Sequence, residues 1–190
     1  MDILNQFIGF LIGIISSWFF WRMLLQVKPK IKVSPVLAYD VEKGILAIKV
    51  INLGRRQAMD IQIHRFSIGE IKPNQRLTTI VVGNIQRVEL PALGPIQDLK
   101  KLWTLSTAFV FKASNGTELV NILKASNEGE RRLILTISST DGLSGTKVVQ
   151  QITYRSEDIR QGTFIKGVDF QITPSITVNQ TDNITDSDDD

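Results

Sequence analysis

In the run Ala58-Met59-Asp60-Ile61-Gln62-Ile63-His64-Arg65-Phe66, apolar and polar residues alternate from Met59 to His64. A period of two is typical of a β-strand with one buried face. The expected inward residues are Met59, Ile61 and Ile63, and the expected outward residues are Asp60, Gln62 and His64. The preceding run, Gly44-Ile45-Leu46-Ala47-Ile48-Lys49-Val50-Ile51-Asn52, is apolar at nearly every position and predicts a strand covered on most of both faces. Asn52-Leu53-Gly54-Arg55 between the two has turn chemistry.

More short strands follow from the same kind of pattern. We expect them at Ile31–Tyr39, Leu77–Val82, Gln86–Leu90, Thr107–Lys112, Arg132–Ser139, Thr146–Arg155 and Thr163–Phe170. Asp141-Gly142 and Ser144-Gly145 mark a hairpin turn inside Leu133–Thr153. One helix is expected over Glu118–Lys124, with Ser114-Asn115 as its cap. Many short strands and few helices predict a mainly β chain folded as a two-layer antiparallel sandwich.

The N-terminal segment has a different character. From Ile3 to Trp21 there are 19 residues without a charge, and eleven of them are Ile, Leu or Phe. As a helix, Ile3–Leu25 would reach roughly 34 Å, which exceeds the hydrocarbon core of about 30 Å. We therefore predict one transmembrane helix. The alternatives are a cleaved signal peptide, which Asp2 and the bulky Trp18–Trp21 run argue against, and a buried core helix, which would show a polar stripe.

Basic residues follow this segment and none precedes it. Arg22, Lys28, Lys30 and Lys32 place the C-terminal side in the cytoplasm by the positive-inside rule. The same four side chains would contact anionic lipid headgroups. The expected organisation is a transmembrane helix over 1–27, a cytoplasmic β-sandwich over 28–172 and a disordered acidic tail over 173–190, with the protein in the cell membrane as a single-pass protein.

Residues for catalysis or cofactor binding do not form a recognisable pattern. Cysteine is absent, which excludes disulfides, thiolate metal sites and cysteine nucleophiles. The single histidine, His64, is expected on the outer face of a strand, without a local nucleophile and carboxylate. The acidic residues lack calcium-loop spacing, and no phosphate-binding glycine loop occurs. We predict no enzyme activity, no metal, no cofactor and, without an aromatic-and-basic pattern, no nucleic-acid partner.

An ordered run in the second half of the chain resembles a known family. The apolar stretch Arg132–Asp141 leads to a second strand and then to Tyr154, Glu157, Asp158, Ile159 and Gly162. In order and spacing these five resemble the C-terminal cytoplasmic domain of inward-rectifier potassium channels. The resemblance covers about Gln26 to Phe170 and implies an immunoglobulin-like sandwich, self-association around an axis, and contact with anionic lipid through Arg22, Lys28, Lys30 and Lys32.

The chain also departs from that family. Gln161 stands where the family has Trp, and the pore loop between two spanning helices is missing. The favoured hypothesis is therefore a membrane-anchored interaction or regulatory module without its own pore. One alternative is an accessory or degenerate subunit that joins a pore-forming channel subunit in potassium transport. Another is an exported, membrane-tethered, adhesion-type domain.

Overall fold

The computed structural model describes residues 2–26, 29–54, 56–71, 78–95, 106–125 and 130–174. Within these ranges the chain is mainly β, with one long N-terminal helix and one short helix, as the sequence predicts. Lys28, which is predicted to contact lipid headgroups, lies outside the described residues. So does the predicted acidic tail beyond Pro174.

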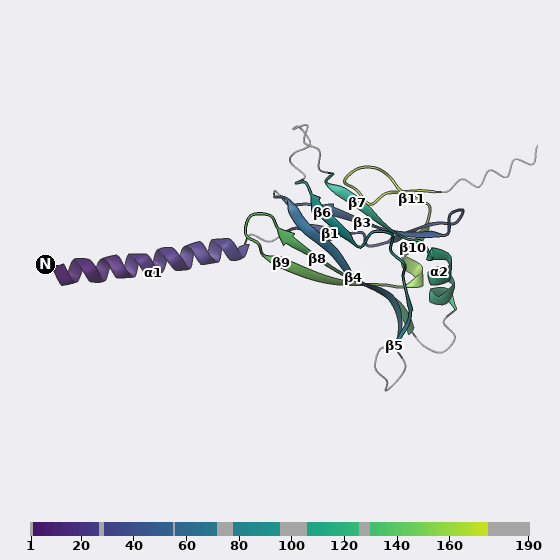
Figure 1. The fold of residues 1–190 in the computed structure, drawn as a ribbon, viewed down its shortest axis with the longest axis horizontal. Coiled ribbons are helices and arrows are strands. Elements are labelled where there is room, and N and C mark those ends of the chain that lie inside the picture. The colour runs from purple at the N-terminus through teal and green to yellow at the C-terminus, as the bar shows by residue number, and fades with distance from the viewer. Residues whose placement is uncertain are drawn as a thin grey trace, which may run out of the picture.

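The long helix, α1 (Asp2–Gln26), projects away from the sheets (Figure 1). None of its most apolar stretch, Asn5–Met23, is buried against the rest of the chain. Large apolar side chains such as Phe10 and Trp21 are each 64% exposed. The helix is long and apolar enough to span a membrane.

The first sheet is built on β3 (Ile45–Asn52), and both edges of this strand are paired. Along one edge runs β7 (Ala108–Ala113), antiparallel to it. Along the other edge lie β1 (Ile31–Val33) and then β2 (Leu37–Asp40), also antiparallel. A late strand, β10 (Ile159–Gln161), adds to β2 in parallel. This is the one parallel pair among the pairings described, whereas the sequence predicts antiparallel pairing throughout.

The second sheet is built on β4 (Ala58–Ile71). One edge pairs with β8 (Glu130–Asp141), which in turn pairs with β9 (Lys147–Tyr154). The other edge pairs with β6 (Glu89–Leu93) near the start of β4 and with β5 (Thr78–Val82) near its end. The predicted hairpin turn lies between β8 and β9, where the N–H of Asp141 donates to the carbonyl of Thr146 over 2.9 Å.

One hydrophobic core joins the two sheets. It includes Leu46, Ile48 and Val50 of β3 together with Leu133, Leu135 and Ile137 of β8. The short helix α2 (Gly116–Lys124) adds Leu119, Val120 and Leu123 to the same cluster. It lies at the end of the β-rich part remote from α1 (Figure 1). Apolar residues from two separate sheets therefore depend on each other for burial.

Besides the parallel pair, four sequence predictions need correction. The predicted strand Ile31–Tyr39 is interrupted after Val33, where Ser34 donates its N–H across to the carbonyl of Lys49 over 2.8 Å and Pro35 has no N–H to continue a ladder. Met59 is predicted to be inward but is 41% exposed. The reason is a shift in the β4–β8 register between Met59 and Gln62, where Asp60 takes a positive φ of 49°. The inward prediction is confirmed for Ile61 and Ile63, which are buried.

The other two corrections concern the last strand and the helix cap. The predicted strand Thr163–Phe170 is a short ribbon, in which β11 (Thr163–Phe164) reverses and pairs with β12 (Ile172–Thr173). Asn115 precedes α2 but its side chain does not cap the helix. Its Oδ1 accepts the N–H of Asn84 over 2.7 Å, and its Nδ2 donates to the carbonyl of Val82, so it fastens the segment after β5 instead.

Candidate functional site

Tyr154 closes β9 and is buried, with 1% of its surface exposed. Its hydroxyl donates a hydrogen bond of 2.7 Å to the carbonyl of Ser34, in the break between β1 and β2. Burial raises the pKa of the Tyr154 phenol well above its usual value. The residue therefore joins the second sheet to the first as a neutral hydrogen-bond donor.

The next motif residues carry the chain from the second sheet to the first. A 3₁₀ turn spans Ser156–Asp158, and the Oδ2 of Asp158 accepts the N–H of Arg155 over 2.8 Å. Ile159 begins β10, opposite Leu37 of β2. Glu157 is exposed on the turn, 3.4 Å from the guanidinium of Arg155.

Gly162 ends this crossover in a conformation that favours glycine. Its φ is +126°, and its N–H donates to the carbonyl of Tyr39 over 2.9 Å. A Cβ at this position would lie 2.0 Å from the carbonyl oxygen of Thr173. The structure thus gives Tyr154, Asp158, Ile159 and Gly162 roles in connecting the sheets, and it does not gather them around a ligand pocket.

The predicted lipid-contact residues lie along the junction between α1 and β1. The guanidinium of Arg22 lies 5.5 Å from the ring centroid of Trp18 on α1. Lys30 and Lys32 are both exposed, and the ammonium of Lys32 lies 5.6 Å from the ring centroid of Phe170. Arg22 and Lys32 lie against different aromatic rings. Cations that are not gathered around one point suit an extended anionic surface more than one small anion.

Hydrogen bonds tie this junction to one end of both sheets. The carbonyl of Lys30 accepts the N–H of Leu53 over 2.8 Å, and the carbonyl of Gln57 accepts the N–H of Gly142 over 3.1 Å. Between these two bonds, Nδ2 of the buried Asn52 donates to the carbonyl of Arg56 over 2.7 Å. We call this region the helix-proximal end, made of the described residues in 29–34, 52–57 and 141–147.

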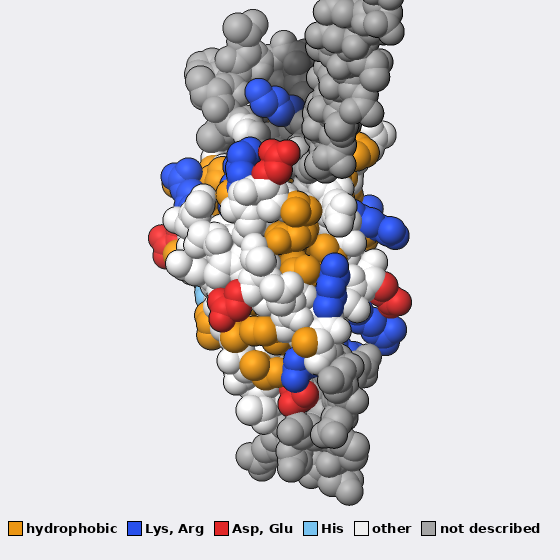
Figure 2. All heavy atoms as spheres, turned by 90° about the vertical axis from the view of Figure 1, so that its right-hand side faces the viewer, with side chains coloured by type: hydrophobic (Ala, Val, Ile, Leu, Met, Phe, Trp, Pro, Cys, Tyr) orange, Lys and Arg blue, Asp and Glu red, His pale blue; other side chains and the backbone are white. Residues whose placement is uncertain are grey.

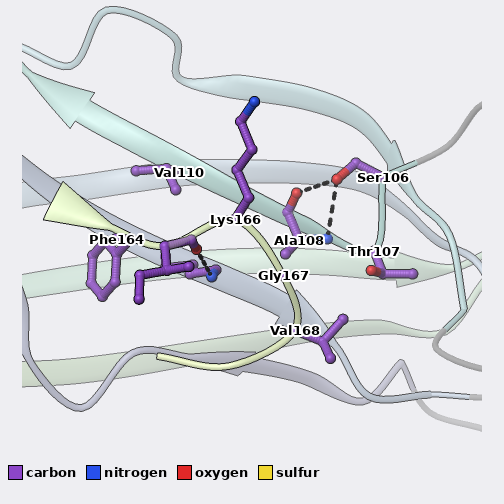
Figure 3. Close-up of a pocket in the computed structure, with 10 residues that line it drawn as sticks. Ser106, Thr107, Ala108, Val110, Phe164, Lys166, Gly167 and Val168 are labelled. Atoms are coloured by element: carbon purple, nitrogen blue, oxygen red, sulfur yellow. Dashed lines mark hydrogen bonds between the residues drawn. The ribbon is translucent and has the colours of Figure 1, made fainter. Parts of the chain in front are cut away.

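A pocket of about 490 Å³ opens on the outer face of the first sheet, between β7 and the segment after β11 (Figure 3). Its lining includes Lys49, Ser106, Val110, Phe164 and Lys166. In Figure 3 the Lys166 side chain extends away from Phe164, while Ser106 is hydrogen-bonded to the backbone of Ala108.

Lys49 is the unusual member of this lining, because it is a lysine with only 1% of its surface exposed. Its Nζ donates to the carbonyl of Ile165 over 2.6 Å and lies 4.0 Å from Oδ1 of Asp169. Burial lowers the pKa of Lys49, and the charge of Asp169 opposes that shift in part. From the sequence, Lys49 is expected only as part of a covered strand. A lone lysine in an otherwise apolar run was the available signal that its charge needed a partner.

Neither region assembles catalytic groups. Within the described residues no three His, Asp or Glu side chains are grouped to hold a metal ion. The ring of His64 is exposed, and its Nε2 lies 2.7 Å from the Oγ of Ser138. Among the described residues no carboxylate is hydrogen-bonded to this ring, so nothing there orients it for base catalysis.

No protein-family model matches the chain. No curated protein matches it at a significant level.

Proposed function

We propose that the chain is a single-pass membrane-anchored module whose β-rich part lies on the cytoplasmic side and acts by interaction, without a pore of its own. The single observation that carries this proposal is that none of the apolar stretch Asn5–Met23 of α1 is buried against the rest of the chain. A core helix of a soluble protein would be mostly buried. Each Leu, Ile or Phe near a bilayer centre favours insertion by about 0.3–0.6 kcal/mol, so eleven contribute on the order of 5 kcal/mol.

Several features support retention of the helix and its direction. The Trp18–Trp21 run stands where a signal peptide would need small residues for cleavage. Indole rings at the end of a span suit the interface. Arg22, Lys30 and Lys32 follow on the C-terminal side, which the positive-inside rule assigns to the cytoplasm, and Lys28 belongs to the same group in the sequence.

The β-rich part is, in this proposal, an immunoglobulin-like sandwich. Two sheets that share one core support a two-layer arrangement. The motif from Tyr154 to Gly162 supports the resemblance to the cytoplasmic domain of inward-rectifier channels. Because most of that motif connects the sheets, its resemblance to the channel domain supports a common architecture more than channel activity. Assembly into a homo-oligomer remains part of the proposal.

Topology mapping tests the anchor and its direction. A reporter fused after Thr177 and a tag before Met1 are read in separate full-length fusions. We expect a cytoplasmic C-terminal reporter, a retained N-terminal tag and resistance to extraction at alkaline pH. An exported C-terminal reporter would favour the adhesion-type alternative, and loss of the tag by cleavage would identify a signal peptide. Co-purification with a pore-forming potassium-channel subunit would favour the accessory-subunit alternative.

A further inference from the structure

The turn between β8 and β9 carries an apolar residue that the domain does not bury in its core. Leu143 is 75% exposed and is not part of the hydrophobic core. It is the one large apolar residue in Asp141-Gly142-Leu143-Ser144-Gly145, where the others are small or polar. The turn is nevertheless ordered by hydrogen bonds. The Oδ1 of Asp141 accepts the N–H of Leu143 over 3.0 Å and that of Ser144 over 2.8 Å. The fold therefore presents Leu143 on a fixed support.

This turn belongs to the helix-proximal end. Gly142 is hydrogen-bonded to Gln57, and the loop that holds Gln57 is bonded through Leu53 to Lys30. Lys30 is four positions after Gln26, the last residue of α1, and four residue steps span at most about 14 Å. The 25 residues of α1 reach about 37 Å, against a hydrocarbon core of about 30 Å. A spanning α1 would thus hold this end of the domain near the headgroups.

The charges of this end match an anionic surface. Its described cations are Lys30, Lys32, Arg56 and Lys147, and all four are exposed. The carboxylate of Asp141 is buried, with the guanidinium of Arg56 4.0 Å away. Leu53, also at this end, is 41% exposed. Exposed aliphatic residues between exposed cations are the composition that binds the boundary between headgroups and acyl chains.

The opposite end of the domain differs. Figure 2 views the end remote from α1, and its hydrophobic side chains form separate groups among charges of both signs. Val41 lies in the β2–β3 turn and is 50% exposed. Since β3 pairs with β2 at Ile45 and with β1 at Asn52, Val41 lies about 23 Å along the strand from the helix-proximal end. It provides a matched control in the same domain.

We infer that the helix-proximal end docks on the membrane that α1 spans, with Leu143 entering the boundary between headgroups and acyl chains and Lys30, Lys32, Arg56 and Lys147 contacting anionic headgroups. This inference rests on the proposed anchoring by α1. It adds a second attachment, which would fix the orientation of the β-rich part relative to the membrane instead of leaving it free on its linker.

Site-specific labelling tests the docking, and the absence of cysteine makes single-cysteine variants direct to build. Full-length L143C, V41C and I14C are each labelled with a polarity-sensitive fluorophore. They are reconstituted in vesicles of phosphatidylcholine and phosphatidylserine, with or without brominated phosphatidylcholine as a quencher. We expect the labels at residues 143 and 14 to emit at shorter wavelength and to be quenched by the brominated lipid. The label at residue 41 should show neither effect.

Each outcome has a distinct meaning. If the label at residue 14 is quenched and the label at residue 143 behaves like that at residue 41, α1 is anchored and the docking inference is wrong. If the label at residue 14 is not quenched, the proposed anchoring itself fails. Equal quenching at residues 143 and 41 would mean that the domain has no preferred orientation. A shift at residue 143 without lipid quenching would indicate a protein contact and would also overturn the inference.

A second measurement removes the influence of the label on Leu143. The fluorophore is placed on K147C, and Leu143→Ser or Val41→Ser is added. We expect lipid quenching at residue 147 to fall severalfold with Leu143→Ser and to stay unchanged with Val41→Ser. Equal quenching in the two variants would show that Leu143 does not hold the end against the bilayer.

Discussion

Replacing Tyr154 with Phe tests whether the motif residue joins the two sheets. The change removes only the hydroxyl, which donates 2.7 Å to the carbonyl of Ser34, and keeps the buried ring. Leaving a buried acceptor without its partner costs about 1–3 kcal/mol. Because urea lowers the free energy of unfolding by about 1–3 kcal/mol per molar in small domains, we expect the midpoint to fall by on the order of 1 M.

Tyr39 is the matched control, because it is the only other tyrosine in the chain. Its hydroxyl lies 3.0 Å from the Oγ1 of Thr117 in an exposed position, where water can replace the lost partner. Urea unfolding of full-length protein in detergent micelles, followed by the β-sheet circular dichroism signal, measures both variants. If Tyr154→Phe shifts the midpoint no more than Tyr39→Phe, the hydroxyl does not secure the crossover and our account of the motif is wrong.

Two further changes test features of the first sheet and its cover. Gly162→Ala should lower the free energy of unfolding by about 3 kcal/mol or more, because it adds a clash with Thr173 to an unfavourable φ. At Gly145 the φ is +66°, but an added Cβ would have no atom within 4 Å. Gly145→Ala should therefore lower the free energy of unfolding by only about 1 kcal/mol in the same urea assay. The lowered pKa of Lys49 means that the unfolded chain binds more protons than the folded chain between that pKa and 10.5. Stability should therefore rise with pH across this window, and the rise should disappear in Lys49→Met but persist in Lys147→Met.

Results in the opposite direction would be informative in both cases. Equal losses for the two glycine variants would mean that the close approach of Thr173 to Gly162 does not exist in solution. A pH-dependent rise that survives in Lys49→Met would show that another group causes it, and that Lys49 is not desolvated by the segment around Ile165.

The strands with clear periodicity could be predicted from sequence because burial alone determines their pattern. β3 is buried along almost its whole length, and the alternation of β4 holds at Ile61 and Ile63. It fails at Met59, where an irregularity in the β4–β8 ladder changes the face on which the side chain lies. Apolar residues remain apolar on either side of such a bulge, so the sequence pattern carries little sign of it.

Features that depend on distant partners were not predictable in the same way. Asn115 has a residue type suited to helix capping, but its side chain bonds to the segment at Val82–Asn84. The return of the chain between β11 and β12 depends on a bond of 3.0 Å from the N–H of Ile165 to the carbonyl of Gln171 and on Gly167 with a φ of +133°. Lys49 is buried because this ribbon covers it. Each of these features is determined by a tertiary contact, which local propensity does not encode.

The parallel pairing of β2 with β10 has a consequence for synthesis of the protein. Leu37 pairs with Ile159, 122 residues later in the chain, so at about 5–20 residues per second β2 waits about 6–24 s for its neighbour. During that interval the first sheet has an unpaired edge along β2. A chain that terminates before Ile159 would keep this edge permanently, and a chaperone that shields nascent strands would be needed most in this interval.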